Sequence, residues 1–245
     1  MNGPIALLLL TYAVAGVPFG LLVTTLQGGD IDVRAAGSGN IGTTNVARLY
    51  GWRTALLVLA ADIAKGLVPV WIASLMRPEL GVLWLTAVAA TAFIGHCFPI
   101  YLGFHGGKGV ATGAGAMLAI TPGPTGIAAA AWGATLYLTG RSSVASLTAT
   151  IVLVLQLLEG DRYRLVPATL LAIGVLGTHT SNIRRLLTGT EGAVVQPVRW
   201  GRTAEPTRSE IDALLDEGPG GGPARPALWR EAPPPDAADP SLNEP

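Results

Sequence analysis

The sequence predicts an all-α integral membrane protein with about seven transmembrane helices, followed by a disordered C-terminal tail. Half of the 245 residues are hydrophobic and only 13% are charged, which is a membrane composition for a chain of this length. The apolar residues gather into long segments, several of which carry no charge. Basic residues collect on alternate connections between these segments and so orient them across a bilayer. We expect the N-terminus outside and the C-terminus in the cytoplasm.

The predicted spans follow from the rule that a membrane helix needs about 20 apolar residues, within a range of roughly 17–25. The first segment lacks the basic region of a signal peptide, so we expect it to remain as a span. Thr121-Pro122-Gly123-Pro124 divides the stretch 109–140, because two close prolines end a helix. The shorter segments need protein rather than lipid around their ends. The seven predicted segments are 4–26, 54–76, 82–104, two within 109–140, 144–158 and 165–178.

The distribution of basic residues gives the orientation of these segments. With the N-terminus outside, the positive charges concentrate in the cytoplasmic connections, and an even number of spans would separate them less well. Every glycine-rich or polar cluster described below then lies at the cytoplasmic interface. The basic residues predicted inside are Arg34, Arg48, Arg53, Lys108, Arg141, Arg184 and Arg185, and those predicted outside are Arg77, Arg162 and Arg164.

The chain divides by composition into a membrane domain, residues 1–195, and a Pro/Gly-rich acidic cytoplasmic tail, residues 196–245. The first part carries 11 Lys/Arg and 7 Asp/Glu, and the second carries 5 Arg, 9 Asp/Glu and 10 of the 18 prolines. A segment of this composition buries too little apolar surface to offset its ordering entropy. We therefore expect the tail to be mostly disordered.

The first polar cluster, residues 37–48, follows the first span and alternates glycines with hydroxyl and amide groups. It then opens into a helical pattern, with a cap at one of the positions 43–45. A helix N-terminus offers free amides to a phosphate, Ser38 can donate a hydrogen bond, and Arg48 can bind phosphate oxygens bidentately. An ordinary polar loop with a helix cap is the alternative.

The second polar cluster, residues 104–113, places Lys108 among glycines in a chain that has only two lysines. Consecutive amides without a Cβ can surround an anion, and the lysine adds a compact positive charge. The segment is not a P-loop, since Leu102 and Gly109 stand at the positions of its first glycine and its Ser/Thr. By itself it predicts a phosphate site or a flexible basic turn about equally.

The third polar cluster, residues 179–185, begins where the last span meets the cytoplasm. His179 can move protons near neutral pH, and Asn182 can orient a substrate. Arg184 and Arg185 are interpreted first as positive-inside anchors.

Two smaller sets of polar residues complete the sequence pattern. Residues 141–143 and Ser146 lie between two spans, where serines often bond only to the backbone. Asp62 and Lys65 are three residues apart and share a helix face inside a predicted span. Ionisable residues there are functional candidates, and mutual neutralisation is an equally good interpretation. The single Cys97 and three scattered histidines predict no metal site and no cofactor.

Together the motifs closely resemble those of the bacterial acyl-phosphate:glycerol-3-phosphate acyltransferases, the PlsY family. The resemblance covers about residues 4–195 and departs mildly at Thr43 and His105. The matching motifs are Ser38-Gly-Asn-Ile-Gly-Thr-Thr-Asn45-Val-Ala-Arg48, His96-Cys-Phe-Pro99 leading to Gly106-Gly-Lys108-Gly-Val-Ala-Thr112, and His179-Thr-Ser-Asn182-Ile-Arg184 with Gly189 and Glu191.

The resemblance implies transfer of a fatty acyl group from acyl phosphate to the 1-hydroxyl of sn-glycerol 3-phosphate, in the bacterial plasma membrane. It implies membrane lipid as a partner, contact with an enzyme that produces acyl phosphate, and no nucleic acid. Whether His179 or the substrate's own phosphate acts as the base stays open. The implied catalytic residues are His179, Lys108 and Ser38, and the implied substrate-binding residues are Arg48, Asn45, Gly106, Gly107, Gly109, Ser143 and Asn182.

The implied chemistry agrees with the residue types. Acyl phosphate is already activated, so the protein needs only to align two phosphate-bearing molecules and stabilise the departing phosphate. A phosphate transporter is the alternative of a different class, although the chain shows no internal repeat. A lipid-phosphate alcohol transferase would need a metal-binding aspartate cluster, whereas Asp62 stands alone.

Overall fold

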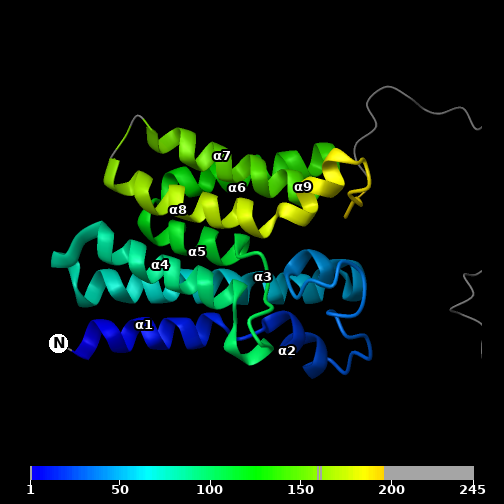
Figure 1. The fold of residues 1–245 in the computed structure, drawn as a ribbon, viewed down its shortest axis with the longest axis horizontal. Coiled ribbons are helices and arrows are strands. Elements are labelled where there is room, and N and C mark those ends of the chain that lie inside the picture. The colour runs from blue at the N-terminus through cyan, green and yellow to red at the C-terminus, as the bar shows by residue number, and fades with distance from the viewer. Residues whose placement is uncertain (1, 159, 161, 196–245) are drawn as a thin grey trace, which may run out of the picture. The chain divides into compact units, whose positions relative to one another are not determined.

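The computed structural model describes residues 2–158, 160 and 162–195, and this part of the chain contains helices but no strand (Figure 1). The predicted all-α class is therefore confirmed for these residues. The described residues belong to one compact unit. The predicted tail, 196–245, lies outside the described residues.

The helices follow the order predicted from the apolar segments. α5 lies between the α3–α4 layer and α8 in Figure 1, and α6, α7 and α8 pack beside one another. The helical elements of the described chain are α1 (Asn2–Ala15), α2 (Phe19–Leu26), α3 (Thr43–Met76), η1 (Pro78–Leu80), α4 (Gly81–Cys97), η2 (Ile100–Leu102), α5 (Val110–Ile120), α6 (Pro122–Thr139), α7 (Ser142–Leu158), α8 (Arg162–Thr178) and α9 (Thr180–Leu187).

The first predicted span, residues 4–26, consists of two helices rather than one. α1 and α2 meet at a bend of 48°. Pro18 stands at the bend and has no N–H with which to continue a helical ladder. The Val17 carbonyl lies in the same break.

The second predicted span, 54–76, matches the part of α3 (Thr43–Met76) that follows a break at Gly51. Gly51 breaks this long helix with φ 83° and ψ 173°, a backbone conformation that favours glycine. The segment before Gly51 is the helical pattern that follows the first polar cluster. It therefore presents its N-terminus toward the Ser38 loop.

The number of full spans is smaller by length and composition than the predicted seven. Within the described residues, Thr43–Met76 and Pro78–Leu102 are long and apolar enough, and the bent pair α1–α2 makes a third if it is one span. α5 has 11 residues and is therefore roughly 16 Å long, about half of a bilayer core. The division at Thr121 and Pro122 is as predicted, since α5 ends at Ile120 and α6 begins at Pro122.

The short α5 is held by unusually close contact with α3. A Cβ on Gly66 would overlap the Thr112 carbonyl group, and a Cβ on Gly115 would overlap the Ile63 carbonyl group. Glycine at both positions lets the two backbones approach. This contact fixes the N-terminus of α5 relative to α3.

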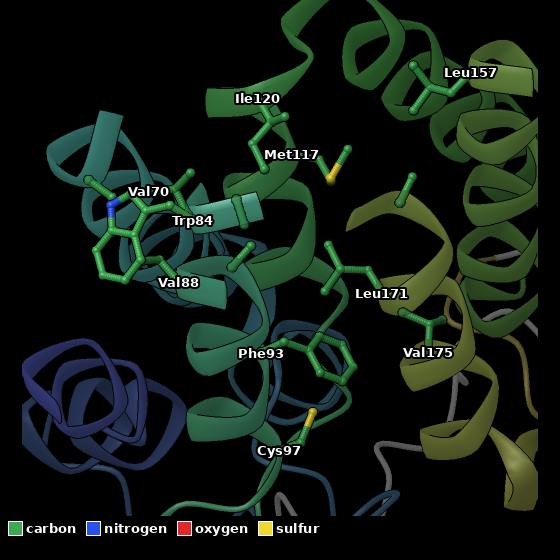
Figure 2. Packing of buried hydrophobic residues seen from close by; sticks show 14 of the residues in the cluster. Val70, Trp84, Val88, Phe93, Cys97, Met117, Ile120, Leu157, Leu171 and Val175 are labelled. Carbon is green, nitrogen blue, oxygen red and sulfur yellow. The ribbon is translucent and has the colours of Figure 1, made fainter. Parts of the chain in front are cut away.

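Apolar side chains fill the space between α4, α5 and α8. Phe93, Met117, Leu171 and Val175 belong to one buried cluster and converge in Figure 2. A second buried cluster, which includes Val33, Ile41 and Val46, lies beneath the loop between α2 and α3. The two clusters thus support the loops that carry the polar residues.

Candidate active site

A cavity of about 760 Å³ brings together residues from all three polar clusters. A second cavity of about 630 Å³ is lined by Gly106 and Gly107 and shares Ser38 and Lys108 with the first. Ser143 lines neither cavity and is buried. The predicted site residues that line the larger cavity are Ser38, Asn45, Arg48, Lys108, Gly109, His179 and Asn182.

Asn45 holds the Ser38 loop and is not available to a substrate. Its side chain accepts a hydrogen bond from the Ser38 amide (2.8 Å) and donates to the carbonyls of Val33 (2.8 Å) and Ala36 (3.0 Å). The residue is only 1% exposed. The predicted substrate-binding role of Asn45 is therefore corrected to a positioning role.

Gly106 and Gly107 close the end of α4 rather than form a free anion-binding turn. The Gly106 amide donates to the Cys97 carbonyl (3.0 Å), and the Gly107 amide donates to the His96 carbonyl (3.1 Å). A Cβ at either position would overlap the end of α4. The last turn of α4 thus occupies these two amides, while both glycines line the smaller cavity and their contact with substrate stays a prediction.

Free amides instead begin one residue later, where α5 starts. Gly109 caps the helix with φ 76°, and the amides of residues 108–112 have no acceptor within the described chain. Gly109, Val110 and Ala111 line the larger cavity. A helix N-terminus of this kind binds anions through its unpaired amides and its dipole.

Lys108 is placed by both neighbouring helices. The Thr178 hydroxyl of α8 donates to its carbonyl oxygen (3.0 Å), so the last turn of α8 fixes the start of α5. Burial lowers the pKa of Lys108 to about 8, an effect that Glu191 opposes and that Arg185 and Arg48 reinforce. At neutral pH the ammonium group is still charged, and an incoming phosphate would stabilise that charge.

His179 is a buried neutral imidazole. Its Nδ1 donates to the Val175 carbonyl (2.9 Å), which leaves Nε2 as the hydrogen-bond acceptor. Burial and the nearby Lys108 lower the pKa of the ring to about 4. The geometry thus assigns the tautomer that a general base requires.

Glu191 is a site residue that sequence reasoning did not assign to the site. Its carboxylate accepts hydrogen bonds from Asn182 Nδ2 (2.7 Å) and from Arg185 Nε (2.6 Å). Asn182 Oδ1 is buried without a partner. Glu191 therefore orients the Asn182 amide and holds Arg185, which lines both cavities. The signals in the sequence were that Glu191 belongs to the third matching motif and is the single acid among residues 162–195.

The carboxylate of Glu191 is charged although it is largely enclosed. Burial raises its pKa, but the approach of Ser143, Asn182 and Arg185 lowers the pKa by more, so the net shift is downward. The Ser143 hydroxyl reaches no partner with normal hydrogen-bond geometry. Ser142, its neighbour, lines the cavity. The structure thus places Ser142 at the cavity wall and Ser143 behind it.

The segment after α9 folds back across the polar end of the cavity. Arg48 Nη2 donates to the Gly192 carbonyl (3.3 Å), and Arg141 Nε donates to the Glu191 carbonyl (3.1 Å). The Val194 amide donates to the Gly140 carbonyl (2.7 Å). Arg48 of α3 and Arg141 of the α6–α7 connection therefore hold this segment in place.

Below its polar end, the larger cavity continues between apolar helices. Its walls there include Leu59 and Ile63 of α3, Met117 of α5, Leu153 of α7 and Leu171 of α8. Cationic groups and free amides thus surround one end, and hydrocarbon surrounds the other. Such a cavity matches an amphipathic molecule with an anionic head.

The fold and the site together define an integral membrane enzyme. A sequence model described as glycerol-3-phosphate acyltransferase matches residues 5–189. The glycerol-3-phosphate acyltransferase of Pseudomonas syringae pv. syringae is 41% identical over 180 residues, which cover 74% of this chain and 92% of the relative. That of Erythrobacter litoralis is 43% identical over 188 residues, covering 76% and 92%.

Solved structures agree with these relatives. The crystal structure of PlsY, an integral membrane glycerol 3-phosphate acyltransferase, in its glycerol 3-phosphate form has a TM-score of 0.71 and 34% identity. Its lysophosphatidic acid form has a TM-score of 0.69. Both cover 78% of this chain and 94% of the solved chain. The chain belongs to the glycerol-3-phosphate acyltransferase family and is an acyltransferase of phospholipid synthesis.

We predict that inorganic phosphate binds to the purified protein and that its affinity falls above pH 8. Lys108 loses its charge through its pKa of about 8, while phosphate keeps its negative charge. Lys108→Ala should weaken binding at pH 7 by about 1.5–3 kcal/mol, the range for a hydrogen bond to a charged group. Calorimetric titration from pH 6 to 10 measures both effects.

The matched control for this prediction is Lys108→Arg, because a guanidinium group stays charged over the whole pH range. This variant should retain binding at pH 9–10. If Lys108→Ala bound phosphate as tightly as the wild type, Lys108 would not be part of the phosphate site.

Proposed function

We propose that the protein transfers a fatty acyl group from acyl phosphate to the 1-hydroxyl of sn-glycerol 3-phosphate, giving lysophosphatidate and inorganic phosphate. The observation that carries this proposal is the larger cavity, which joins a cationic polar end to an apolar interior. An acyl phosphate has the same division, with an anionic head and a hydrocarbon chain. The site therefore suits both the donor and the product.

Two phosphate groups can bind together only if the cavity carries more positive charge than its own acidic residues neutralise. Arg48, Lys108 and Arg185 line it, and Glu191 is the acid at the same end. Arg185 is paired with Glu191, whereas no carboxylate lies within ion-pair distance of Lys108 among the described residues. Lys108 is thus free to contact phosphate oxygens, and the amides of α5 lie beside it. Arg48 still has N–H donors besides the one that holds the Gly192 carbonyl.

The reaction joins the glycerol 1-oxygen to the acyl carbonyl carbon and breaks the bond from that carbon to the phosphate oxygen. The phosphate leaves with the bonding electron pair, and Lys108 with the amides of residues 109–112 stabilises its charge. Because the phosphate is already a good leaving group, the protein's main task is alignment of the two molecules. Ser38 and Asn182 are placed to orient them.

The proton of the attacking hydroxyl needs an acceptor, and His179 Nε2 is the protein group with a free lone pair. Its pKa of about 4 makes it a weak base before substrate arrives. Two bound phosphates raise that pKa, since an adjacent negative charge favours the charged imidazole. We assign His179 as the base, with an oxygen of the substrate phosphate as the competing acceptor.

The proposal also includes the orientation of the protein in the membrane. We place the N-terminus outside and all three polar clusters at the cytoplasmic face, in a multi-pass protein of the bacterial plasma membrane with about seven membrane-crossing segments. The positive-inside distribution of charges supports this orientation. The short α5 needs no lipid contact along its full length, since α3, α4 and α8 surround it.

In an activity assay, the detergent-purified protein should form equal amounts of lysophosphatidate and phosphate from palmitoyl phosphate and sn-glycerol 3-phosphate, without added metal or coenzyme A. Mass spectrometry and a phosphate assay measure the two products. Palmitoyl-coenzyme A is the control donor and should give no product. Turnover that requires the thioester would reject acyl phosphate as the donor.

The assignment of the base predicts that His179→Asn lowers kcat about 10²–10⁴-fold and leaves KM nearly unchanged. The Asn amide can still donate to the Val175 carbonyl in place of Nδ1, whereas nothing replaces Nε2. Steady-state kinetics with both substrates measure the change. A decrease in kcat of less than about tenfold would instead indicate that the substrate phosphate accepts the proton.

Cysteine labelling tests the orientation. Cys97 is buried, so an introduced cysteine is the reactive one. Gly3→Cys, where a Cβ meets no neighbour, should react with an impermeant maleimide in intact cells. His105→Cys, on an exposed loop, should react only after permeabilisation. The reverse pattern would invert the topology.

A further inference from the structure

A buried ionic cluster lies beside the active site and has no part in the reaction described above. Lys65 Nζ is 2.8 Å from Asp62 Oδ1, and the two side chains are 2% and 4% exposed. His96 Nδ1 of α4 lies 3.7 Å from the same carboxylate oxygen. Both Asp62 Oδ1 and His96 Nδ1 are buried without a hydrogen bond of normal geometry.

On one side, this cluster joins the bend between α1 and α2. Lys65 Nζ donates to the Val17 carbonyl (3.2 Å), which lies in the break that Pro18 causes. The same ammonium group lies 5.5 Å from the centre of the Phe19 ring, within cation–π distance. Lys65 therefore adds a second hydrogen bond to the Val17 carbonyl, which also accepts one from the Phe19 amide (3.0 Å), and it ties α3 to that bend.

On the other side, the cluster reaches the Lys108 loop. The His96 carbonyl accepts the Gly107 amide hydrogen bond, and the His96 ring packs so closely on Gly107 that a Cβ there would overlap Nε2. Gly107 directly precedes Lys108 in the chain. Asp62 and His96 also line the larger cavity. A continuous chain of contacts thus runs from Val17 through Lys65, Asp62 and His96 to the loop.

A gain in folding stability does not by itself explain such a buried cluster. A buried ion pair loses hydration that its mutual attraction only partly restores, and apolar residues of similar size often replace it without loss of stability. A rigid support for a catalytic group has a larger effect, because a misplacement of about 1 Å can reduce turnover about 10²-fold.

We propose that Asp62, Lys65 and His96 are positioning residues that hold the Gly107–Lys108 loop in its phosphate-binding geometry. The inference rests on the proposed role of Lys108 in the acyl transfer. Asp62 sets the place of the His96 ring, the ring sets the place of Gly107, and Lys65 neutralises and fixes Asp62. None of the three needs to contact a substrate.

The test is a double-mutant cycle between Asp62→Asn and Lys108→Ala, measured as kcat/KM for glycerol 3-phosphate with palmitoyl phosphate as donor. With Lys108 present, Asp62→Asn should lower kcat/KM about 10²-fold. In the Lys108→Ala protein the same substitution should add less than about a threefold loss, because the side chain whose placement Asp62 supports is already absent. A merely structural role would instead give equal losses in both backgrounds.

Two further variants keep the test decisive if Asp62→Asn fails to fold. Asp62→Asn with Lys65→Met removes both charges, so this double variant should fold and should show the same kinetic loss. Val88→Ala, in the core of the helix that carries His96, is the stability control and should lower Tm while kcat/KM stays at the wild-type value.

Wild-type kinetics in a folded Asp62 variant, or equal losses in the two Lys108 backgrounds, would overturn the inference. Either result leaves the proposed function intact as long as the wild-type protein turns over acyl phosphate in the same assay. Failure of the wild-type protein would instead reject the proposed function itself.

Discussion

The active site depends on the backbone hydrogen bonds where the end of α4, the start of α5 and the end of α8 meet. The last carbonyls of α4 accept the amides of Gly106 and Gly107, and Thr178 at the end of α8 donates to the Lys108 carbonyl. These bonds pair backbone groups at the ends of α4 and α8 and leave the first amides of α5 without an acceptor. The unpaired amides are therefore left where an anion can replace the missing acceptors.

The same rule explains why a carboxylate lies in a site for anionic substrates. Glu191 pairs with Arg185 and orients Asn182, so its charge is balanced before any substrate enters. The segment that carries it is fixed by Arg48 and Arg141 through backbone carbonyls. An acid placed in this way lowers the positive potential only locally, and it keeps two polar side chains rigid.

Sequence reasoning predicted the helical class, the break at Thr121-Pro122 and the meeting of three clusters on one face, because hydropathy, proline and charge are local properties of the chain. It could not predict that Asn45, Gly106 and Gly107 serve the protein's own backbone, since a free amide and a bonded amide look alike in a sequence. It predicted the span 54–76 and the helical pattern around Arg48 separately, and the structure joins them as α3 across the break at Gly51. Glu191 received no role because the sequence does not show that its carboxylate reaches Asn182 and Arg185.

The two lysines of this chain show how burial separates a structural charge from a functional one. Lys65 is enclosed by Asp62, the Val17 carbonyl and the Phe19 ring, so each part of its ammonium group already has a partner. Lys108 is only half-buried, and among the described residues it has no carboxylate at contact distance. The remaining hydrogen-bond acceptors for its ammonium group must come from a molecule bound in the cavity. An ammonium group that is partly desolvated and unpaired binds phosphate more strongly than one in water, because less hydration is lost on binding. The first lysine thus fixes the scaffold from which the second acts.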